Sequence, residues 1–204
     1  MKKKELIISV VIFGILASLI TYYLLSGGKT LNVQIPDEQN SAKELVQLAK
    51  PYVDDYWEDR KYYVGKITME LDKNHEGEVK IWYKDDRGKR TGEVANILTV
   101  SIDTRKNKIL AITEQPSDSK IEPGIIHIDK WKVDSTGIMN IVKEAFKDES
   151  DFDYTDISIH GMDYYGGDKE VWDTVIFDDK HSKAYNLTLD PYTGEVLAKE
   201  IKDY

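Results

Sequence analysis

Hydrophobic positions recur at helical spacing in the stretch that follows residue 40. Apolar side chains lie at steps of three, four and one, at Ala42, Leu45, Ala49, Tyr52, Val53 and Tyr56. This spacing places them on one helical face and predicts a helix from Ser41 to Trp57. Ser41 and Glu44 have the spacing of a capping box, which marks the helix start. Pro51 is expected to kink or divide the helix.

Alternating, β-branched and aromatic stretches follow and predict an antiparallel meander. The expected strands span residues 62–71, 78–84, 96–103 and 108–113, with polar turns between them. The second half of the chain has the same order of a helix followed by strands. A second helix is expected after Asp134 and Ser135, with an apolar stripe that ends at Phe146, and strands are expected at 155–162, 170–177, 184–190 and 195–201.

The two halves match best in their closing hairpins. Residues 96–111 align without gaps to 183–198 at a constant offset of 87. Asp103 falls on Asp190, and Asn107 falls on Gly194. Asparagine and glycine both tolerate positive φ, which a tight hairpin turn is expected to need. The match indicates an internal duplication, and a chance similarity between two hairpins is the alternative.

An uncharged apolar run near the N-terminus predicts a transmembrane helix. It extends from Leu6 to Leu25 and follows three lysines. A helix of this length spans about 30 Å, the thickness of the bilayer interior. Lysines on its N-terminal side predict a cytoplasmic N-terminus. A cleaved signal peptide is the alternative, although its apolar region would be shorter. A lipid anchor through cysteine is excluded, because the chain has none.

These elements predict an α+β protein, with an N-terminal transmembrane helix followed by two units that each combine a helix with an antiparallel sheet. The expected divisions are a stub and anchor (1–28), a linker (29–40), a first unit (41–115), a second linker (116–124) and a second unit (125–204). The expected location is the plasma membrane, crossed once, with the C-terminal domain outside the cell.

Charge and composition narrow the classes of partner. The chain has 204 residues, a net charge of −9 and no cysteine. An acidic surface disfavours nucleic acid, since phosphate backbones attract basic surfaces. The absence of cysteine excludes disulfides, thiolate metal sites and cysteine nucleophiles. A cysteine-free exterior rich in lysine is typical of a bacterial protein.

Two stretches of the second half resemble PepSY-type domains. Residues 131–145 are similar to the helix opening of that family, and residues 185–197 are similar to its closing hairpin, with Asp190, Thr193, Gly194 and Val196 in an Asp-x-x-Thr-Gly-x-Val pattern. The resemblance implies tandem PepSY-like units, each with one helix packed on a curved antiparallel sheet. Such domains are typically extracytoplasmic, and they occur beside peptidases and in envelope and sporulation proteins. The first half departs from the pattern, because Asn107 replaces the turn glycine and the loop 85–94 is longer.

No motif in the chain indicates catalysis, a cofactor or a metal site. The histidines lack the spacing of a helical zinc site, and the acidic stretch 148–153 lacks the glycine that an EF-hand loop requires. No serine lies in a nucleophile motif. We therefore expect no catalytic residues, no bound cofactor and no bound metal.

Aromatic residues are the remaining indication of a site. Tyrosines and a tryptophan gather at the end of the first helix, and Trp82 and Trp172 fall in predicted strands, where core packing is the simpler interpretation. The preferred candidate interface is the stretch Tyr164, Tyr165, Gly166 and Gly167, because tyrosine gives a large contact area at low entropic cost.

The sequence thus favours a non-catalytic, membrane-anchored, extracytoplasmic binding or regulatory module. Its expected partner is a cell-envelope protein, such as a wall synthase, peptidase or sensor, or an extended peptide that adds a strand to a sheet edge. Two alternatives remain open. One is an envelope hydrolase with a carboxylate pair, and the other is a passive structural subunit of an envelope complex.

Overall fold

A single antiparallel sheet of nine strands organises the part of the chain that the structure describes. The structure is a computed structural model, which describes residues 28–36, 41–86, 95–117, 124–149, 154–163 and 169–204. In spatial order the strands are β1, β5, β4, β3, β2, β6, β7, β8 and β9. Their bounds are Gly28–Gln34 (β1), Tyr62–Asp72 (β2), Gly77–Asp85 (β3), Asn96–Asp103 (β4), Lys108–Pro116 (β5), Asp156–Asp163 (β6), Glu170–Asp178 (β7), Lys183–Leu189 (β8) and Val196–Asp203 (β9).

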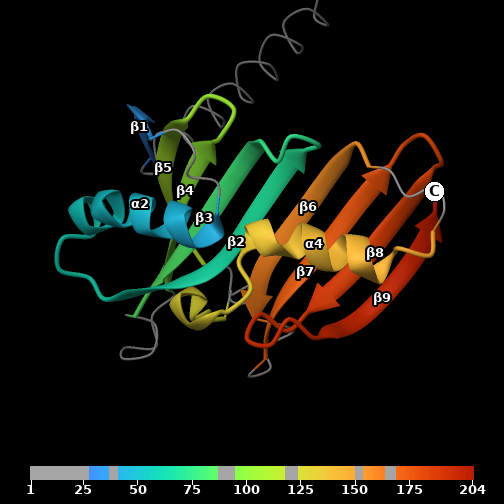
Figure 1. The fold of residues 1–204 in the computed structure, drawn as a ribbon. Coiled ribbons are helices and arrows are strands. Elements are labelled where there is room, and N and C mark those ends of the chain that lie inside the picture. Colours follow the sequence, from blue (N-terminus) through green and yellow to red (C-terminus); the bar gives the residue numbers. More distant parts are fainter. Residues whose placement is uncertain (1–27, 37–40, 87–94, 118–123, 150–153, 164–168) are drawn as a thin grey trace, which may run out of the picture.

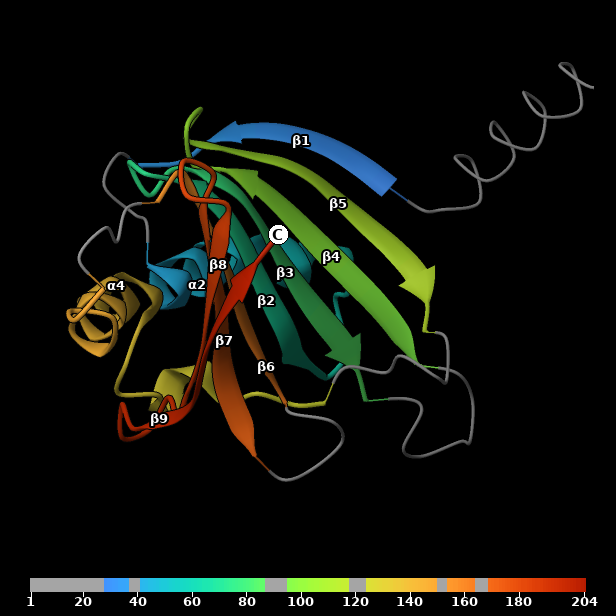
Figure 2. The same ribbon diagram turned by 90° about the vertical axis from the view of Figure 1, so that its right-hand side faces the viewer.

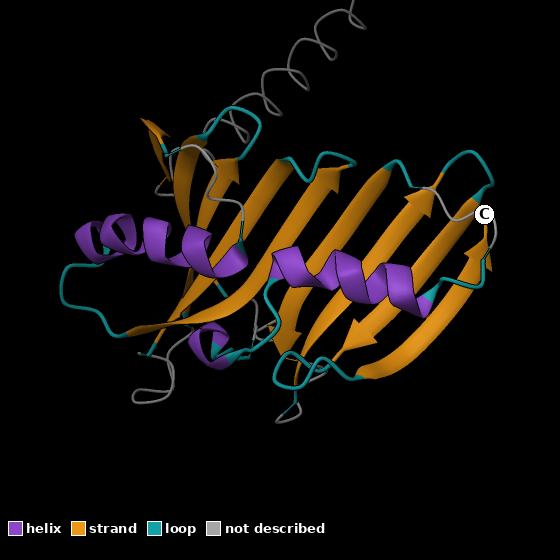
Figure 3. Cartoon of the chain, in the orientation of Figure 1, coloured by secondary structure: helices purple, strands orange, loops and turns teal. Residues whose placement is uncertain are grey.

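Two α-helices, α2 (Ala42–Tyr56) and α4 (Ser135–Ala145), lie across the same face of this sheet (Figures 1 and 3). Seen from the side, both helices stand on one side of the strands, and the strand direction twists strongly from β1 to β9 (Figure 2). A short 3-10 helix, η1 (Ile128–Lys130), precedes α4. The opposite face of the sheet carries the alternate side chains of each strand, where polar residues such as Glu70 and Ser158 are mixed with apolar ones such as Val175.

Each helix begins where the sequence predicts and buries its predicted stripe. Ser41 caps α2, and the reciprocal hydrogen bonds with Glu44 complete the capping box. Asp134 caps α4 by accepting a hydrogen bond from the Ser135 backbone. Pro51 lies inside α2, which continues through it to Tyr56, so the predicted division does not occur.

The predicted fold of two separate helix-plus-sheet units is wrong. The first strands of the two halves, β2 and β6, pair along their length, with Lys66 opposite Met162 and Asp72 opposite Asp156. The two meanders therefore form one continuous sheet. Both halves gain from this arrangement, because joining their first strands removes two exposed sheet edges.

The predicted transmembrane helix and the single-pass membrane location are also contradicted. Within the described ranges, no helix has both the length and the apolar character needed to cross a bilayer. The run from Leu6 to Leu25 itself lies outside those ranges.

Residues expected to form a linker instead contribute an edge strand. Strand β1 occupies much of the predicted 29–40 linker and pairs with β5. Leu31 and Val33 pack against the core at alternate positions, a short strand pattern that the polar composition obscured. The register shifts between Thr30 and Val33, and Asn32 has a φ of 50°. This bulge makes the β1 edge less able to pair with a strand of another chain.

The closing hairpins of the two halves share their irregularities. The β4–β5 register shifts between Ser101 and Ile102, and the β8–β9 register shifts between Thr188 and Leu189. These positions are related by the offset of 87 that the sequence alignment gave. Bulges at matching positions confirm that the sequence match reflects equivalent hairpin geometry.

Candidate binding pocket

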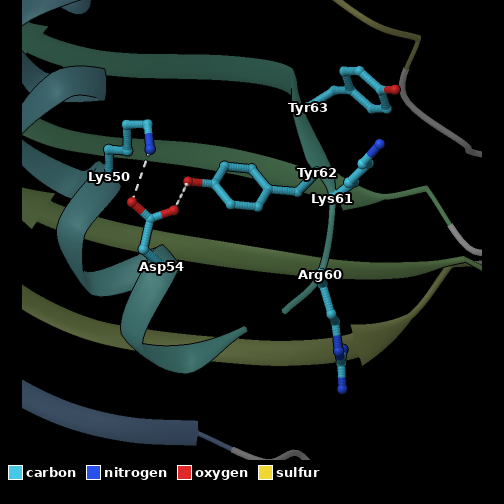
Figure 4. A pocket seen from close by; sticks show the side chains of 6 residues that line it. All are labelled: Lys50, Asp54, Arg60, Lys61, Tyr62 and Tyr63. Carbon is cyan, nitrogen blue, oxygen red and sulfur yellow. Dashed lines mark hydrogen bonds and ion pairs between the residues drawn. The ribbon is translucent and has the colours of Figure 1, made fainter. Parts of the chain in front are cut away.

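A solvent-open pocket of about 350 Å³ lies where the chain leaves α2 and enters β2. Its lining residues are Lys50, Asp54, Arg60, Lys61, Tyr62 and Tyr63 (Figure 4). The first two come from the last turns of α2, and the others come from the connection and the start of β2. Three cations and one carboxylate thus gather here in a chain whose net charge is −9.

One side of the pocket is a closed hydrogen-bonded network. Asp54 accepts hydrogen bonds from the Lys50 ammonium at 2.8 Å and from the Tyr62 hydroxyl at 2.5 Å (Figure 4). The Lys50 and Tyr62 hydrogen bonds hold the pKa of Asp54 below its usual value. Burial of the ring and the hydrogen bond to Asp54 raise the pKa of Tyr62 to about 12. Asp54 is therefore a fixed anion and Tyr62 a fixed donor at neutral pH.

Packing on the core holds Tyr62 in this position. Its ring lies 6.0 Å from the Trp57 ring and 5.6 Å from the buried Tyr83 ring. Side chains alternate between the two faces of a strand, so Tyr62 faces the helices and Tyr63 faces the other side. In Figure 4 the two tyrosines accordingly point in different directions. Tyr63 is 38% exposed.

Arg60 is oriented by Glu114, a half-buried carboxylate on β5. One guanidinium nitrogen lies 2.6 Å from Glu114, which also accepts hydrogen bonds from the Trp57 indole at 3.1 Å and from the Asn96 amide at 2.8 Å. The guanidinium also lies 5.4 Å from the Trp57 ring. The buried Asp85 carboxylate lies 3.9 Å from the same guanidinium, so Glu114 and Asp85 together position Arg60 and balance its charge. In Figure 4 the Arg60 side chain accordingly points away from Lys61.

The lining groups suit binding an anion better than acid–base chemistry. A glycosidase pair needs two carboxyl groups about 5–10 Å apart, whereas this pocket has one carboxylate, with both oxygens engaged. Cations and phenol hydroxyls complement a carboxylate or phosphate group. Within the described ranges, no group of three or more potential metal ligands converges.

A second polar cluster lies on the sheet face away from the helices. The Ser158 hydroxyl donates to Glu70 at 2.8 Å and lies 3.0 Å from Nε2 of His160. Serine and histidine are thus at hydrogen-bonding distance, as in a nucleophile–base pair. Ser158 lies in β6, however, between β2 and β7, whose ladders occupy the adjacent backbone N–H groups. The strand therefore offers no oxyanion hole.

A third cluster surrounds Glu170 at the start of β7. Its carboxylate accepts hydrogen bonds from the His127 backbone at 2.8 Å, the His127 ring at 2.6 Å, the Trp131 indole and the Tyr192 hydroxyl. Burial alone would raise the pKa of Glu170, but the hydrogen bonds from His127, Trp131 and Tyr192 outweigh it and lower the pKa. The cluster ties three chain segments together, which indicates a structural role.

The hairpin residues singled out from the sequence form turns and stand apart from the pocket lining. Asp190 accepts hydrogen bonds from the backbones of Tyr192 and Thr193 at 2.8 and 3.1 Å, and Gly194 has a φ of 81°. In the first half, Asp103 binds the Lys106 ammonium at 2.7 Å, and Asn107 has a φ of 50°.

The predicted interface of Tyr164, Tyr165, Gly166 and Gly167 lies outside the described residues, as does most of the predicted 116–124 linker. The two tryptophans expected in strands lie on different faces of the sheet. Trp172 is fully buried under the helices, whereas Trp82 lies on the opposite face.

The pocket itself was not predicted, although the sequence offered a partial signal. Lys50 and Asp54 have helical i, i+4 spacing, and the noted aromatic cluster includes Tyr62 and Tyr63.

Comparison with known proteins identifies the fold but no family. No protein-family model matches the chain, so the PepSY resemblance gains no support, and no curated protein matches it in sequence. The fold is similar to the crystal structure of a protein from Clostridium difficile 630 described as a "putative lipoprotein", with a TM-score of 0.52 and 16% sequence identity. The similarity covers 84% of this chain and 99% of that protein. At this level of identity, the chain shares a fold with that protein.

Proposed function

We propose that this chain is a non-catalytic extracytoplasmic module that binds, and thereby regulates, a cell-envelope protein. The observation that carries the proposal is the pocket at the end of α2, where the exposed Lys61 accompanies a carboxylate already paired with Lys50 and Tyr62. This pocket is suited to hold an acidic group of a partner. The fold similarity to a protein described as a "putative lipoprotein" supports a place in the bacterial envelope.

A binding role also agrees with the state of the titratable groups. The lowered pKa of Asp54 and the raised pKa of Tyr62 keep both groups in one protonation state near neutral pH. A general acid or base works best when its pKa lies near the working pH. Groups with such fixed states are better suited to hold a ligand than to transfer protons.

In-cell photocrosslinking tests the proposal. The full chain would carry p-benzoylphenylalanine in place of Tyr63, which is exposed at the pocket rim. The matched control places the same group at Tyr204, which is 62% exposed and lies just beyond β9, the strand at one edge of the sheet. We expect position 63 to capture one envelope protein that position 204 does not capture. Adding Lys61→Glu should abolish that capture. Equal capture from both positions, or capture that survives Lys61→Glu, would overturn the proposal.

A further inference from the structure

The pocket continues onto the sheet face that lies away from the helices. Tyr63 on β2 is opposite Lys84 on β3, and Lys66 is opposite Trp82. The register shift between Val64 and Lys66 keeps both pairs on the same face, because Val64 is opposite Tyr83, which points into the core. Tyr63, Lys84, Trp82 and Lys66, hereafter the β2–β3 strip, therefore form a continuous surface that begins at the pocket rim.

The strip combines positive charge with aromatic surface. The Lys66 ammonium lies 5.2 Å from the centre of the Trp82 ring, within the range of a cation–π contact. Burial lowers the pKa of Lys66, and the nearby carboxylates of Asp173 and Glu70 only partly offset that effect. The half-buried Lys66 ammonium is thus held against the Trp82 ring, where an incoming anion would stabilise its charged form.

From these features, we infer that the pocket and the β2–β3 strip together bind an extended acidic peptide segment. One carboxylate would lie in the pocket beside Lys61, and the peptide would continue past Tyr63 to a second carboxylate near Lys66. Three residue steps along β2 separate Tyr63 from Lys66, about 10 Å, and the pocket adds two more from Lys61, so a peptide of about six residues covers both sites. The inference rests on the proposed function and names the chemistry of the partner's segment.

Charge distribution favours a short acidic peptide over a long anionic polymer. The chain as a whole has a net charge of −9 and repels a polyanion at a distance. Carboxylates are also interspersed among the cations, with Glu70 and Asp173 near Lys66 and Asp54 in the pocket. Such a mixed surface complements a few well-placed charges better than a uniform phosphate backbone.

The sheet edges are less suited to an extended peptide than this face. The bulge at Asn32 interrupts β1, which forms one edge. The other edge, β9, carries Lys199, Glu200 and Lys202, and charged side chains on an edge disfavour strand addition. The peptide is therefore expected to bind across side chains and not by adding a strand.

Fluorescence anisotropy of the full chain tests the inference. The probe is a fluorescein-labelled glutamate peptide of about six residues, and the matched control is the same peptide made of glutamine. We expect Lys61→Ala and Lys66→Met each to weaken binding of the glutamate peptide by about tenfold, because each removes a charge-assisted contact. Lys66→Met keeps the apolar stem over Trp82. Lys202→Ala, on the β9 edge, should leave the affinity unchanged.

Each alternative outcome has a distinct meaning. If Lys61→Ala weakens binding and Lys66→Met does not, the extension along the strip is wrong, while the pocket and the proposed function stand. If the glutamate peptide binds no better than the glutamine peptide, the acidic peptide is the wrong ligand class, and the photocrosslinking result alone decides the proposed function. If inorganic polyphosphate of matched charge binds more tightly than the glutamate peptide, a phosphate polymer replaces the peptide. If Lys202→Ala weakens binding equally, the edge strand is the site.

Discussion

Two clusters in this protein use the same kinds of side chain for different ends. Asp54 and Glu170 each accept a hydrogen bond from a tyrosine hydroxyl and from a basic side chain. The side chain of Asp54 is 50% exposed, whereas that of Glu170 is 9% exposed. The difference in exposure accounts for the two roles. The exposed cluster lies beside Lys61, which a ligand can reach, and the buried one joins parts of the fold.

The partners of the two carboxylates explain the contrast. Those of Glu170 come from two distant segments: His127 and Trp131 lie around η1, and Tyr192 lies in the turn after β8. Those of Asp54 are its helical neighbour Lys50 and the adjacent strand residue Tyr62. Loss of Glu170 would leave the buried Trp131 indole without its acceptor, whereas loss of Asp54 would leave groups that water can reach.

The largest expected effect is on stability and comes from Glu170→Ala. Removing the carboxylate leaves the Trp131 indole and the His127 backbone N–H without their acceptor, so we expect the free energy of unfolding to fall by about 3 kcal/mol. Urea unfolding followed by circular dichroism measures this change. If the free energy of unfolding falls by less than about 1 kcal/mol, the Glu170 cluster does not have the structural role assigned to it.

A smaller loss is expected from Gly161→Ala, which lies beside Trp172 and beside Trp131, the donor to Glu170. A Cβ at this position would lie 2.7 Å from the Trp172 ring and 3.0 Å from the Trp131 ring. We expect a loss of about 2 kcal/mol from overpacking. Gly137→Ala in α4 is the matched control, because its Cβ would meet Val133 at an ordinary 3.7 Å. That variant should be as stable as the wild type or slightly more stable. Equal losses in both would argue against tight packing under Trp131.

The pH dependence of unfolding should report the contribution of the Glu170 carboxylate. Because the folded protein lowers the pKa of Glu170 from its ordinary value of 4.5, its contribution is present above that pH and disappears as the pH falls through the folded value. Urea unfolding at a series of pH values from about 6 to 3 should show a steeper loss of stability in the wild type than in Glu170→Gln. If stability falls equally with pH in the wild type and in Glu170→Gln, the pKa of Glu170 is not lowered by folding.

The smallest expected effect comes from Asp54→Asn. Because Asp54 and Lys50 are both well exposed, we expect stability to change by no more than about 0.5 kcal/mol. The pKa of Tyr62 should fall below about 12, since its raised value depends partly on Asp54. Absorbance of tyrosinate during an alkaline titration, compared between the wild type and Asp54→Asn, measures this shift. If Asp54→Asn lowers the free energy of unfolding as much as Glu170→Ala does, the two clusters do not differ in their structural role.

Local signals in the sequence were enough to predict the helices and hairpins. The Ser41 and Glu44 pair predicted the start of α2, and the match of Asn107 with Gly194 predicted two turns that both have positive φ. These features depend on residues a few positions apart, whose hydrogen bonds and backbone angles follow from residue type.

Long-range features could not be predicted in the same way. The pairing of β2 with β6 joins residues such as Lys66 and Met162, and no pattern within either strand specifies its neighbour. The Glu170 cluster likewise assembles from His127, Trp131 and Tyr192 only once the sheet is formed. The pocket depends on both kinds of information: the spacing of Lys50 and Asp54 is local, but the fold brings Glu114 to orient Arg60.

Nuclear magnetic resonance of the labelled full chain during titration with the glutamate peptide tests the contrast between the clusters most directly. We expect the backbone signals of Lys61 and Tyr63 to shift with increasing peptide, and the indole N–H signal of Trp131, bound to Glu170, to stay in place. A shift of the Trp131 signal with no change at Lys61 and Tyr63 would contradict it, since the buried cluster would then be the one that responds to the ligand.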